Sequence, residues 1–163
     1  MCDSFDKKVP DVMVVRVPSF RAVTSGLEPW DVVFGAFDKW MTANQRLVAP
    51  AIFDCPDFLT GEGDKCEWYW RVKDDVTEAD TAPYKIVDFP GGLYAVAVCI
   101  DGDDESHNKV RAKMDAWLAT TNFIEDTSRR KAGHMIYVDE EIRKGLGYHQ
   151  LNLYLPVKLK ADN

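Results

Sequence analysis

Seven side chains in three short segments have the chemistry of a pocket for organic molecules. Most are aromatic, one is a carboxylate and one is a thioether: Glu67, Trp68, Tyr69, Trp70, Met135, Tyr137 and Tyr154. The face of a tyrosine or tryptophan ring attracts a cation by about 0.5–2 kcal/mol, and a nearby carboxylate adds to this attraction. A methionine in a pocket wall adapts to ligands of varied shape, although it can equally be ordinary packing. Residues of these types can line a pocket, although a large core is the commoner use of so many aromatic side chains.

The sequence shows no spacing typical of a catalytic or metal centre. Its three histidines stand apart from any serine or cysteine nucleophile motif, and they are His107, His134 and His149. The acidic runs at residues 62–64 and 101–105 lack the ligand spacing of a calcium-binding EF-hand and are typical of solvated turns. The four cysteines form no C-x-x-C pair, which metal and redox centres often use. We therefore expect neither a metal site nor a cofactor.

The last two strands that the sequence predicts place three of these residues on one face. Residues 149–157 alternate leucines with polar and aromatic side chains. Side chains of a strand point alternately to its two faces, so the leucines pack beneath helices and Tyr154 lies on the opposite, pocket-lining face. The preceding strand, residues 134–138, places Met135 and Tyr137 on that same face.

The aromatic segment at residues 66–72 reads CEWYWRV and also has the composition of a strand. Alternation groups Glu67 with Tyr69 on one face, and Trp68 with Trp70 on the other. In this register the first pair lines the pocket and the two tryptophans join the core. A slip of one residue, or a β-bulge, would exchange the faces. Both pairs are therefore candidates.

The elements that position these residues occur twice along the chain. An apolar strand runs into Pro18 and then an Ala-Val pair, and a similar strand runs into Pro90 and a second Ala-Val pair. The two prolines are 72 residues apart (90 − 18 = 72). Each strand is followed by a helix-patterned stretch that ends near a tryptophan, Trp40 in the first and Trp117 in the second. The pattern indicates two similar modules joined side by side.

Each module has the element order β-α-β-β, over residues of about 10–76 and about 84–158, with an acidic linker at 73–83 between them. A single helix covers only one face of its sheet, so the other face is free to form a cleft. We predict one α+β domain over residues 1–163. Its two modules are related by a pseudo-two-fold axis, with a curved antiparallel sheet, two helices on one side and a ligand cleft on the other.

Two segments of the second module resemble a known family. The segment FPGGLYAV at residues 89–96 and the segment LYLPVK at residues 153–158 are similar to the best-marked segments of the GyrI-like small-molecule-binding family. That family also supplies the effector-binding domains of bacterial AraC-type and MerR-type multidrug-responsive regulators. The resemblance covers nearly the whole chain and agrees with the duplicated element order. It implies a cleft between the modules, lined by aromatic residues, that accepts bulky and often cationic molecules.

The same resemblance raises a question of charge. Family members that prefer cations carry an acidic residue on the strand before the last one, and Met135 stands at the matching position here. A cation without a counter-charge in a dry pocket costs several kcal/mol, which is more than stacking on tyrosine returns. We therefore expect the pocket to prefer neutral or only partly desolvated cationic aromatic ligands, unless Glu67 points into the cleft.

Composition restricts the partners of the chain. It carries 27 acidic and 20 basic residues, a formal net charge of −7. Non-specific binding to DNA or RNA requires basic residues that neutralise phosphates, so this charge argues against a nucleic-acid partner. No apolar stretch approaches membrane-spanning length, and the N-terminus lacks the apolar centre of a signal peptide. We expect a cytoplasmic protein without membrane contact.

The residues and the resemblance together predict a stand-alone module that senses or sequesters hydrophobic or aromatic compounds, in connection with transcriptional regulation or drug response. Two alternatives remain open. In the first, the chain hydrolyses electrophilic small molecules, with Glu67 as general base and Tyr137 or Tyr154 as a positioning donor. In the second, it binds a protein partner, as the gyrase inhibitor that names the family does.

Overall fold

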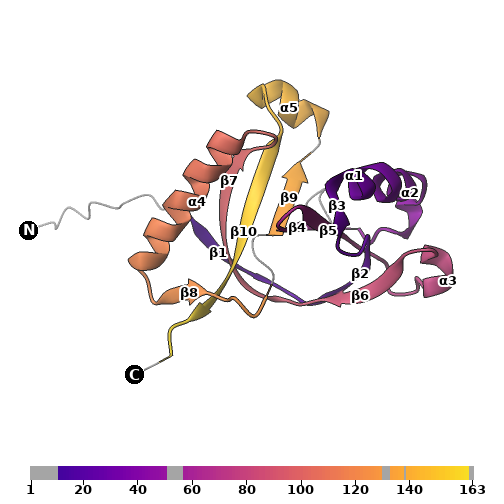
Figure 1. Cartoon of the computed structure of the whole chain (residues 1–163), viewed down its shortest axis with the longest axis horizontal. Coiled ribbons are helices and arrows are strands. Elements are labelled where there is room, and N and C mark those ends of the chain that lie inside the picture. Colours follow the sequence, from indigo (N-terminus) through magenta and orange to yellow (C-terminus); the bar gives the residue numbers. More distant parts are fainter. Residues whose placement is uncertain (1–10, 51–56, 130–132, 138, 162–163) are drawn as a thin grey trace, which may run out of the picture.

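The computed structural model describes residues 11–50, 57–129, 133–137 and 139–161, with the backbone alone for residues 134–137 (Figure 1). The strands are β1 (Met13–Val17), β2 (Phe20–Thr24), β3 (Glu28–Pro29), β4 (Asp57–Glu62), β5 (Lys65–Arg71), β6 (Lys85–Phe89), β7 (Gly92–Ile100), β8 (Phe123–Glu125), β9 (Gly133–Tyr137) and β10 (Gln150–Leu159). The helical segments are α1 (Trp30–Val32), the π-helical η1 (Val33–Phe37), α2 (Asp38–Ala43), the 3-10 turn η2 (Gln45–Leu47), α3 (Glu78–Thr81), α4 (Asp104–Ala119) and α5 (Glu140–Leu146).

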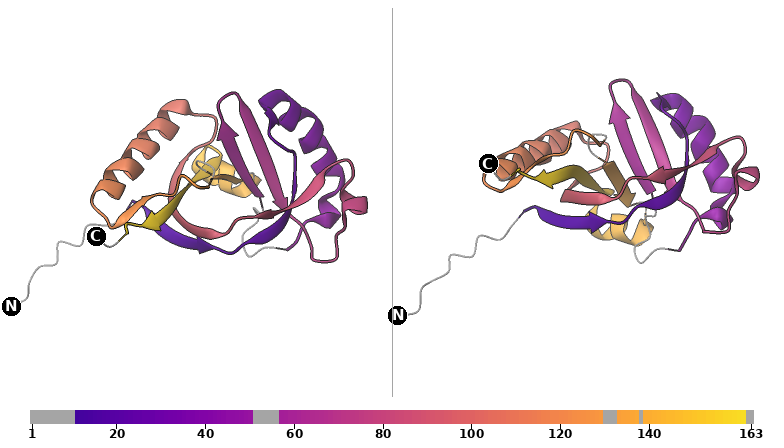
Figure 2. Two further views of the ribbon diagram at one scale, coloured as in Figure 1. Left: turned by 60° about the horizontal axis from the view of Figure 1, so that its bottom comes forward. Right: turned by 90° about the horizontal axis from the view of Figure 1, so that it is seen from below.

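The strands form one curled antiparallel sheet (Figure 2). The hydrogen-bonded order is β1-β7-β10-β9-β4-β5-β2-β6, with β3 beside β5 and β8 beside β10. The curl brings strands together that are not neighbours in this order. The rings of Phe58 on β4 and Phe89 on β6 stack with their centroids 4.8 Å apart. The sheet is therefore a half-barrel with an interior.

The strand order and the register are both symmetric. β2, β4 and β5 of the first half occupy the same relative places as β7, β9 and β10 of the second, and β4 pairs with β9 at the centre. A shift of 72 residues carries Met13 to Lys85 and Thr24 to Val96. Met13 pairs with Val96, and Thr24 pairs with Lys85. Each pair therefore contains one residue and the equivalent, 72 positions later, of a residue in the other pair, so the two pairs are equivalent by symmetry. The predicted α+β arrangement of β-α-β-β units is confirmed, whereas the exact module boundaries stay a prediction.

The first strand of each half pairs with the other half. β1 pairs with β7, and β6 pairs with β2, which makes one long ribbon that is interrupted where Pro18 faces the Pro90-Gly91 turn. The two backbones pass very close together there. A Cβ atom on Gly91 would lie 2.3 Å from the backbone nitrogen of Ser19 and 2.6 Å from the carbonyl carbon of Pro18. Only glycine fits at this crossing without a shift of the backbone.

Replacing Gly91 with alanine is expected to lower the free energy of unfolding by about 1–3 kcal/mol, because the added methyl group overpacks two backbone segments. Urea denaturation at equilibrium measures this loss. Gly145→Ala in α5 is the matched control, since its Cβ atom would have nothing within 4 Å. The control is expected to be neutral or slightly stabilising. Equal effects of the two substitutions would contradict the close crossing.

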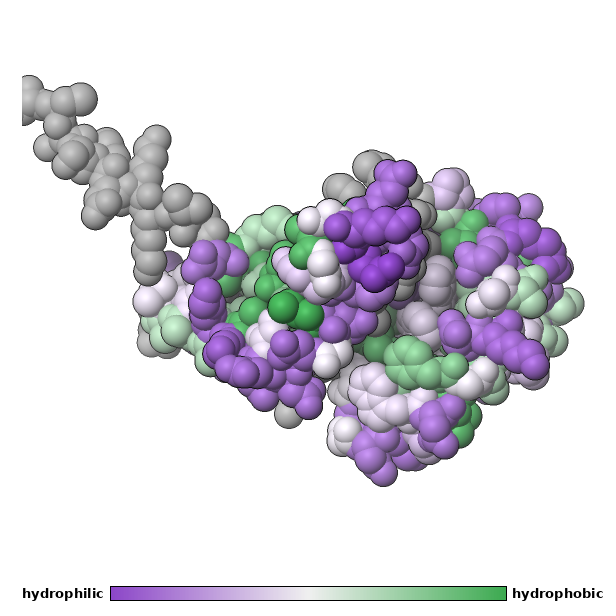
Figure 3. Space-filling model, turned by 90° about the horizontal axis from the view of Figure 1, so that it is seen from above, coloured by the Kyte–Doolittle hydropathy of each residue, from purple (hydrophilic) through white to green (hydrophobic). Residues whose placement is uncertain are grey.

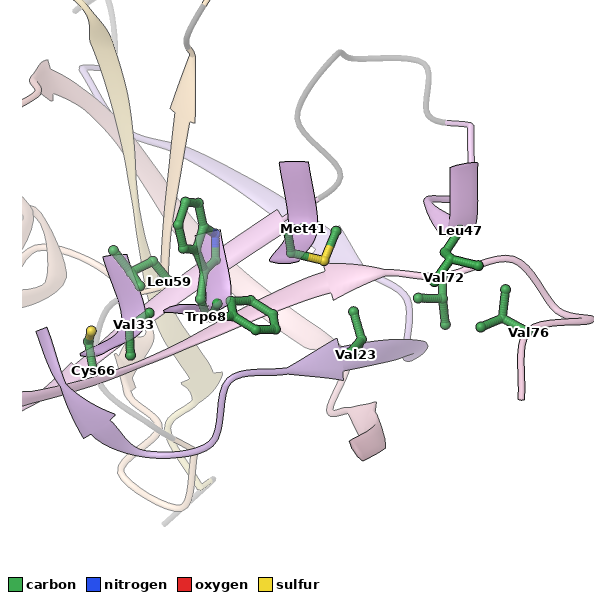
Figure 4. Packing of buried hydrophobic residues seen from close by; sticks show 10 residues of the cluster. Val23, Val33, Met41, Leu47, Leu59, Cys66, Trp68, Val72 and Val76 are labelled. Atoms are coloured by element: carbon green, nitrogen blue, oxygen red, sulfur yellow. The ribbon is translucent and has the colours of Figure 1, made fainter. Parts of the chain in front are cut away.

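Two apolar clusters lie on the sheet face that the helices cover, which we call the helix face. Beneath α1 to α2, Val33, Phe37 and Met41 pack on side chains of β2, β4 and β5 (Figure 4). Beneath α4, Met114 packs on β7 and β10. The leucines predicted to lie beneath a helix are buried in this second cluster: Leu151, Leu153 and Leu155.

Register shows that both clusters occupy the same face. His134 of β9 is the cross-strand partner of Leu153 on β10 and of Leu59 on β4. Cross-strand partners share a face of the sheet, so Leu153 of one cluster and Leu59 of the other point to the same side. Among the helices that the structure describes, none is both long enough and apolar enough to cross a bilayer.

Candidate ligand-binding site

The sheet face opposite the helices lines the half-barrel and is rich in aromatic residues; we call it the inner face. Its buried cluster and the partly buried side chains packed against it consist of Val15, Val17, Phe20, Ala22, Phe58, Tyr69, Val87, Phe89, Tyr94, Val96 and Tyr154. Alternation explains the grouping, since Tyr69 lies between Trp68 and Trp70, which belong to the helix face. The inner face is where the sequence predicts the ligand site.

Ring contacts organise the inner face around Phe58. Its ring stacks on Phe89 and lies edge-on to Tyr154, with centroids 5.0 Å apart and an interplanar angle of 74°. Tyr69 meets Phe89 edge-on at 5.2 Å, and Tyr94 meets Tyr154 edge-on at 6.0 Å. Such pairs stabilise by about 0.5–1.5 kcal/mol beyond the burial of their area. The aromatic walls are therefore held in place before any ligand binds.

A hollow of about 240 Å³ opens beside these rings. Its lining combines aromatic faces with hydroxyl groups and one guanidinium: Thr60, Tyr69, Phe89, Pro90, Tyr94, Ser128, Arg129 and Gly133. This volume lies slightly below the roughly 300–1,000 Å³ of typical pockets for drug-sized ligands. The hollow therefore suits a compound of one or two rings that can also exchange hydrogen bonds.

Arg129 supplies a positive charge inside this site. The guanidinium carbon lies 4.7 Å from the ring centroid of Tyr94, and Nε donates to Oδ2 of Asp126 at 2.9 Å. Nη2 donates to the carbonyl oxygens of Leu93 at 2.9 Å and Val157 at 3.1 Å. The side chain is 12% exposed. The face of Tyr94 thus already holds a cation, which disfavours a second one.

The carboxyl of Asp126, which pairs with Arg129, is ionised over the whole physiological range. Hydrogen bonds from Ser128 and then from Arg129 lower the pKa of Asp126 to about 2. A carboxyl whose pKa is depressed by folding stabilises the native state above its unfolded pKa, near 4, and loses this contribution as the pH falls through about 2. The carboxylate of Asp126 therefore stays ionised beside Arg129 at neutral pH.

Two of the predicted site residues occupy equivalent places in the two halves of the sheet. Tyr69 on β5 pairs with Thr24, and Tyr154 on β10 pairs with Val96, which lies 72 residues after Thr24 (96 − 24 = 72). Tyr69 is buried and Tyr154 is half-buried. The structure thus brings these two tyrosines to the same face from opposite halves, as alternation predicts.

Glu67 lies next to this set without entering the hollow. Its carboxylate is buried and accepts a hydrogen bond from the hydroxyl of Thr24 at 2.5 Å. Met135 and Tyr137 are placed by register alone, opposite Asn152 and Gln150 of β10. Their side chains lie outside the described part of the structure.

The two tryptophans belong to the opposite face. Trp68 is buried among the side chains beneath α1 to α2, and Trp70 packs against the same cluster. The indole Nε1 of Trp68 donates to Oδ2 of Asp57 at 2.7 Å. Trp68 and Trp70 therefore do not line the inner-face hollow. Alternation along β5 predicts the face of both tryptophans correctly.

Asp57 and Arg129 are the charged residues that sequence reasoning missed. Burial raises the pKa of Asp57 to about 7, and the hydrogen bond from Trp68 opposes part of this increase. An aspartate directly before an apolar run carries no signal of burial. Arg129 lies in an irregular segment, and its carbonyl partners are on β7 and β10, so no local pattern could reveal its role.

Comparison with solved structures identifies the fold. No family model matches the chain, and neither does any curated protein. SAV2435 bound to tetraphenylphosphonium matches with a TM-score of 0.60 and 12% identity, over 91% of this chain and 94% of that one. The EcmrR C-terminal domain matches with a TM-score of 0.63 and 9% identity, over 91% and 98%. A hydrolase from Listeria innocua matches with a TM-score of 0.60 and 18% identity, over 91% and 92%.

The chain has the fold of GyrI-like effector-binding domains. Each of these matches covers 91% of the chain. This confirms the fold that the segments at residues 89–96 and 153–158 indicate.

Proposed function

We propose that this protein binds small aromatic molecules in the inner-face hollow and acts as a sensing or sequestering module. The observation that carries the proposal is the preformed aromatic surface from both halves of the sheet, around a hollow with hydrogen-bonding groups. The likeness to SAV2435 supports it, since that protein has the same fold and is bound to an organic molecule, tetraphenylphosphonium. A link to transcriptional regulation or drug response follows from the resemblance to effector-binding domains and belongs to the proposal.

The electrostatics of the hollow favour a neutral ligand. Arg129 lies in the lining over Tyr94, while the carboxylate of Glu67 is engaged with Thr24 outside the lining. A cationic ligand would meet the guanidinium at close range, and the ion pair with Asp126, which is not among the lining residues, offsets the repulsion of like charges only in part. A neutral two-ring compound with a hydroxyl group, such as 1-naphthol, matches both the volume and the polar groups.

Hydrolysis receives less support from the same geometry. The proposed general base, Glu67, does not line the hollow. The thiols of Cys66 and Cys99 are no better placed as nucleophiles, because burial raises the pKa of each to about 11 and keeps them protonated at neutral pH. Binding without turnover is therefore the function we propose.

Replacing Tyr154 with alanine is expected to weaken 1-naphthol binding by about 1 kcal/mol, because Tyr154 does not itself line the hollow and affects the ligand through the ring of Tyr94, which does. Tyr154 packs on Phe58 and Tyr94, so its removal also loosens the ring that lines the hollow. Isothermal titration calorimetry measures the affinity, and Tyr154→Phe is the control that keeps the ring. An unchanged affinity in folded Tyr154→Ala protein would contradict the proposed site.

A further inference from the structure

A buried carboxyl and two indole rings lie together on the helix face, beneath α1 to α2. Asp57 is 4% exposed, and its Oδ2 accepts a hydrogen bond from Nε1 of Trp68 at 2.7 Å. Asp57 is also the cross-strand partner of Trp70. Cross-strand partners share a face of the sheet, with Cβ atoms about 4.5–5.5 Å apart. Both indoles therefore lie within reach of one carboxyl group.

The second indole is an unsatisfied donor. Within the part of the chain that the structure describes, Nε1 of Trp70 is buried and has no hydrogen-bond acceptor. A buried donor without an acceptor is rare in native proteins and destabilises the fold. Because register places Asp57 directly opposite Trp70, a turn of the indole toward its cross-strand partner would satisfy this donor.

The charge of Asp57 decides how many donors its carboxyl needs. A protonated carboxyl donates one hydrogen bond itself, whereas a carboxylate only accepts and is stable in apolar surroundings only when donors face it. Burial raises the pKa of Asp57 to about 7, and the hydrogen bond from Trp68 opposes part of this increase. Asp57 therefore keeps its proton below about pH 7 and loses it above this value.

Other charged residues of the surrounding elements are kept away from Asp57. Those of β4, β5 and the segments α1 to η2 lie on the inner face or reach solvent: Glu62, Lys65, Glu67, Arg71, Asp31, Asp38, Lys39 and Arg46. The space-filling view accordingly shows hydrophilic residues over much of the outer surface (Figure 3). Burial raises the pKa of Cys66 to about 11 and that of Tyr84 above its usual value, so neither is charged at neutral pH.

Two basic residues share the helix face with Asp57. Arg21 on β2 donates to the backbone carbonyl oxygens of Asp74 at 2.8 Å and Val76 at 2.9 Å. On β9, register places His134 opposite Leu59, two residues along β4 from Asp57. A histidine ordinarily titrates near neutral pH, so a test must separate His134 from Asp57.

A chain of ring contacts joins the buried carboxyl to the surface. The ring of Trp68 (Figure 4) lies 5.7 Å from that of Trp70 and 5.1 Å from that of Phe34. Phe34 in turn stacks on Trp30, with centroids 5.9 Å apart and an interplanar angle of 5°. These outer two rings are 42% and 39% exposed. A turn of Trp70 is therefore passed through ring contacts to side chains at the surface.

We propose that Asp57 and the two indoles beside it form a pH-sensitive switch beneath the exposed rings of α1 and η1. While Asp57 holds its proton, Trp68 alone donates to it, as in the structure. When the proton leaves to water, the carboxylate accepts a second bond from Nε1 of Trp70, whose ring turns toward it. Hydrogen bonds to an ionised group are roughly twice as strong as neutral ones, so ionisation recruits the second donor. The switch lies on the helix face and is independent of ligand binding in the inner-face hollow.

The test follows the indole N–H resonances of isotope-labelled protein in two-dimensional NMR spectra between pH 5 and pH 9. We expect the resonance of Trp70 to move downfield as the pH rises through about 7, because its proton gains an acceptor. The resonance of Trp30, at the outer end of the ring chain, should shift with the same midpoint. Trp117, which packs in the cluster beneath α4, is the internal control and should not move.

Three variants assign the titrating group. In Asp57→Asn the resonances of Trp70 and Trp30 should no longer depend on pH in this range, whereas His134→Gln should keep the transition. Trp70→Phe removes the donor that stabilises the carboxylate, so the midpoint, now followed on Trp68 and Trp30, should move to higher pH. If Asp57→Asn does not fold, the midpoint in Trp70→Phe still tests the bond.

Any of the following results would overturn the switch. A Trp70 resonance that stays constant from pH 5 to pH 9 would show that its donor gains no acceptor. A shift that persists in Asp57→Asn, or disappears in His134→Gln, would assign the titration to another group. An unchanged midpoint in Trp70→Phe would exclude a bond from Trp70 to the carboxylate, and a constant Trp30 resonance would show that the change does not reach the exposed rings.

Discussion

Replacing Arg129 with methionine is expected to lower the free energy of unfolding by about 1–3 kcal/mol, the range for leaving buried hydrogen-bond acceptors without a donor, since Asp126 keeps Ser128 and Lys158 as partners. The substitution removes the bond to Asp126, two bonds to backbone carbonyls of Leu93 and Val157, and the contact with Tyr94. Methionine keeps the volume of the stem but leaves these acceptors without their donor. Urea denaturation measures the loss.

A second arginine provides the matched control. Arg143 pairs with Glu140 at 2.8 Å on α5, but the two side chains are 42% and 57% exposed. Exposed pairs of this kind contribute little to stability, because water screens the two charges. Arg143→Met should therefore change stability very little. Similar losses in the two variants would mean that Arg129 is an ordinary surface residue and that the inner face has no internal cation.

Replacing Asp57 with asparagine is expected to stabilise the protein at pH 8, on the order of 3 kcal/mol, and to leave it nearly unchanged at pH 4. Burial raises the pKa of Asp57 to about 7. The folded protein therefore holds this proton more tightly than the unfolded chain, whose ordinary pKa is near 4. Stability is lost as the pH rises from about 4 to 7, and above 7 the loss is complete.

Asparagine removes the charge and keeps an oxygen that accepts from Nε1 of Trp68. The measurement is a series of urea denaturations between pH 4 and pH 8 for wild type and variant. At each pH, the difference between their free energies of unfolding reports the titration of the carboxyl at residue 57. Asp64→Asn, on the exposed turn between β4 and β5, is the control for the chemical change itself and should alter stability very little. A constant difference between wild type and Asp57→Asn across the pH range would contradict the buried, titrating carboxyl.

Periodicity and repetition in the sequence predict most of the fold. The leucines of β10 and the alternation in β5 assign faces correctly, because one-sided burial leaves a pattern of period two. The repeated prolines reveal the symmetric arrangement of the two halves. Neither pattern reveals that β1 pairs with β7 and β6 with β2, since Pro18 and Pro90 appear in the sequence only as kinks.

The candidate sites are less accessible to sequence reasoning. Tyr69 and Tyr154 follow from alternation, whereas Arg129 reaches the inner face through contacts with strands distant in the chain. Trp30 and Phe34 belong to the same apolar helical stripe as the buried Val33 and Phe37. A stripe pattern cannot distinguish a residue at the covered centre of a helix from one at its open edge.

The most direct test of the central claim locates a bound neutral ligand on the protein. We expect 1-naphthol to shift the backbone amide resonances of Thr60, Tyr94 and Gly133 in two-dimensional NMR spectra, because these residues line the inner-face hollow. Intermolecular Overhauser contacts with the ring protons of Tyr69 and Tyr94 should accompany the shifts. Absence of saturable shifts, or shifts confined to the helix face around Trp30 and Gly102, would contradict ligand binding inside the half-barrel.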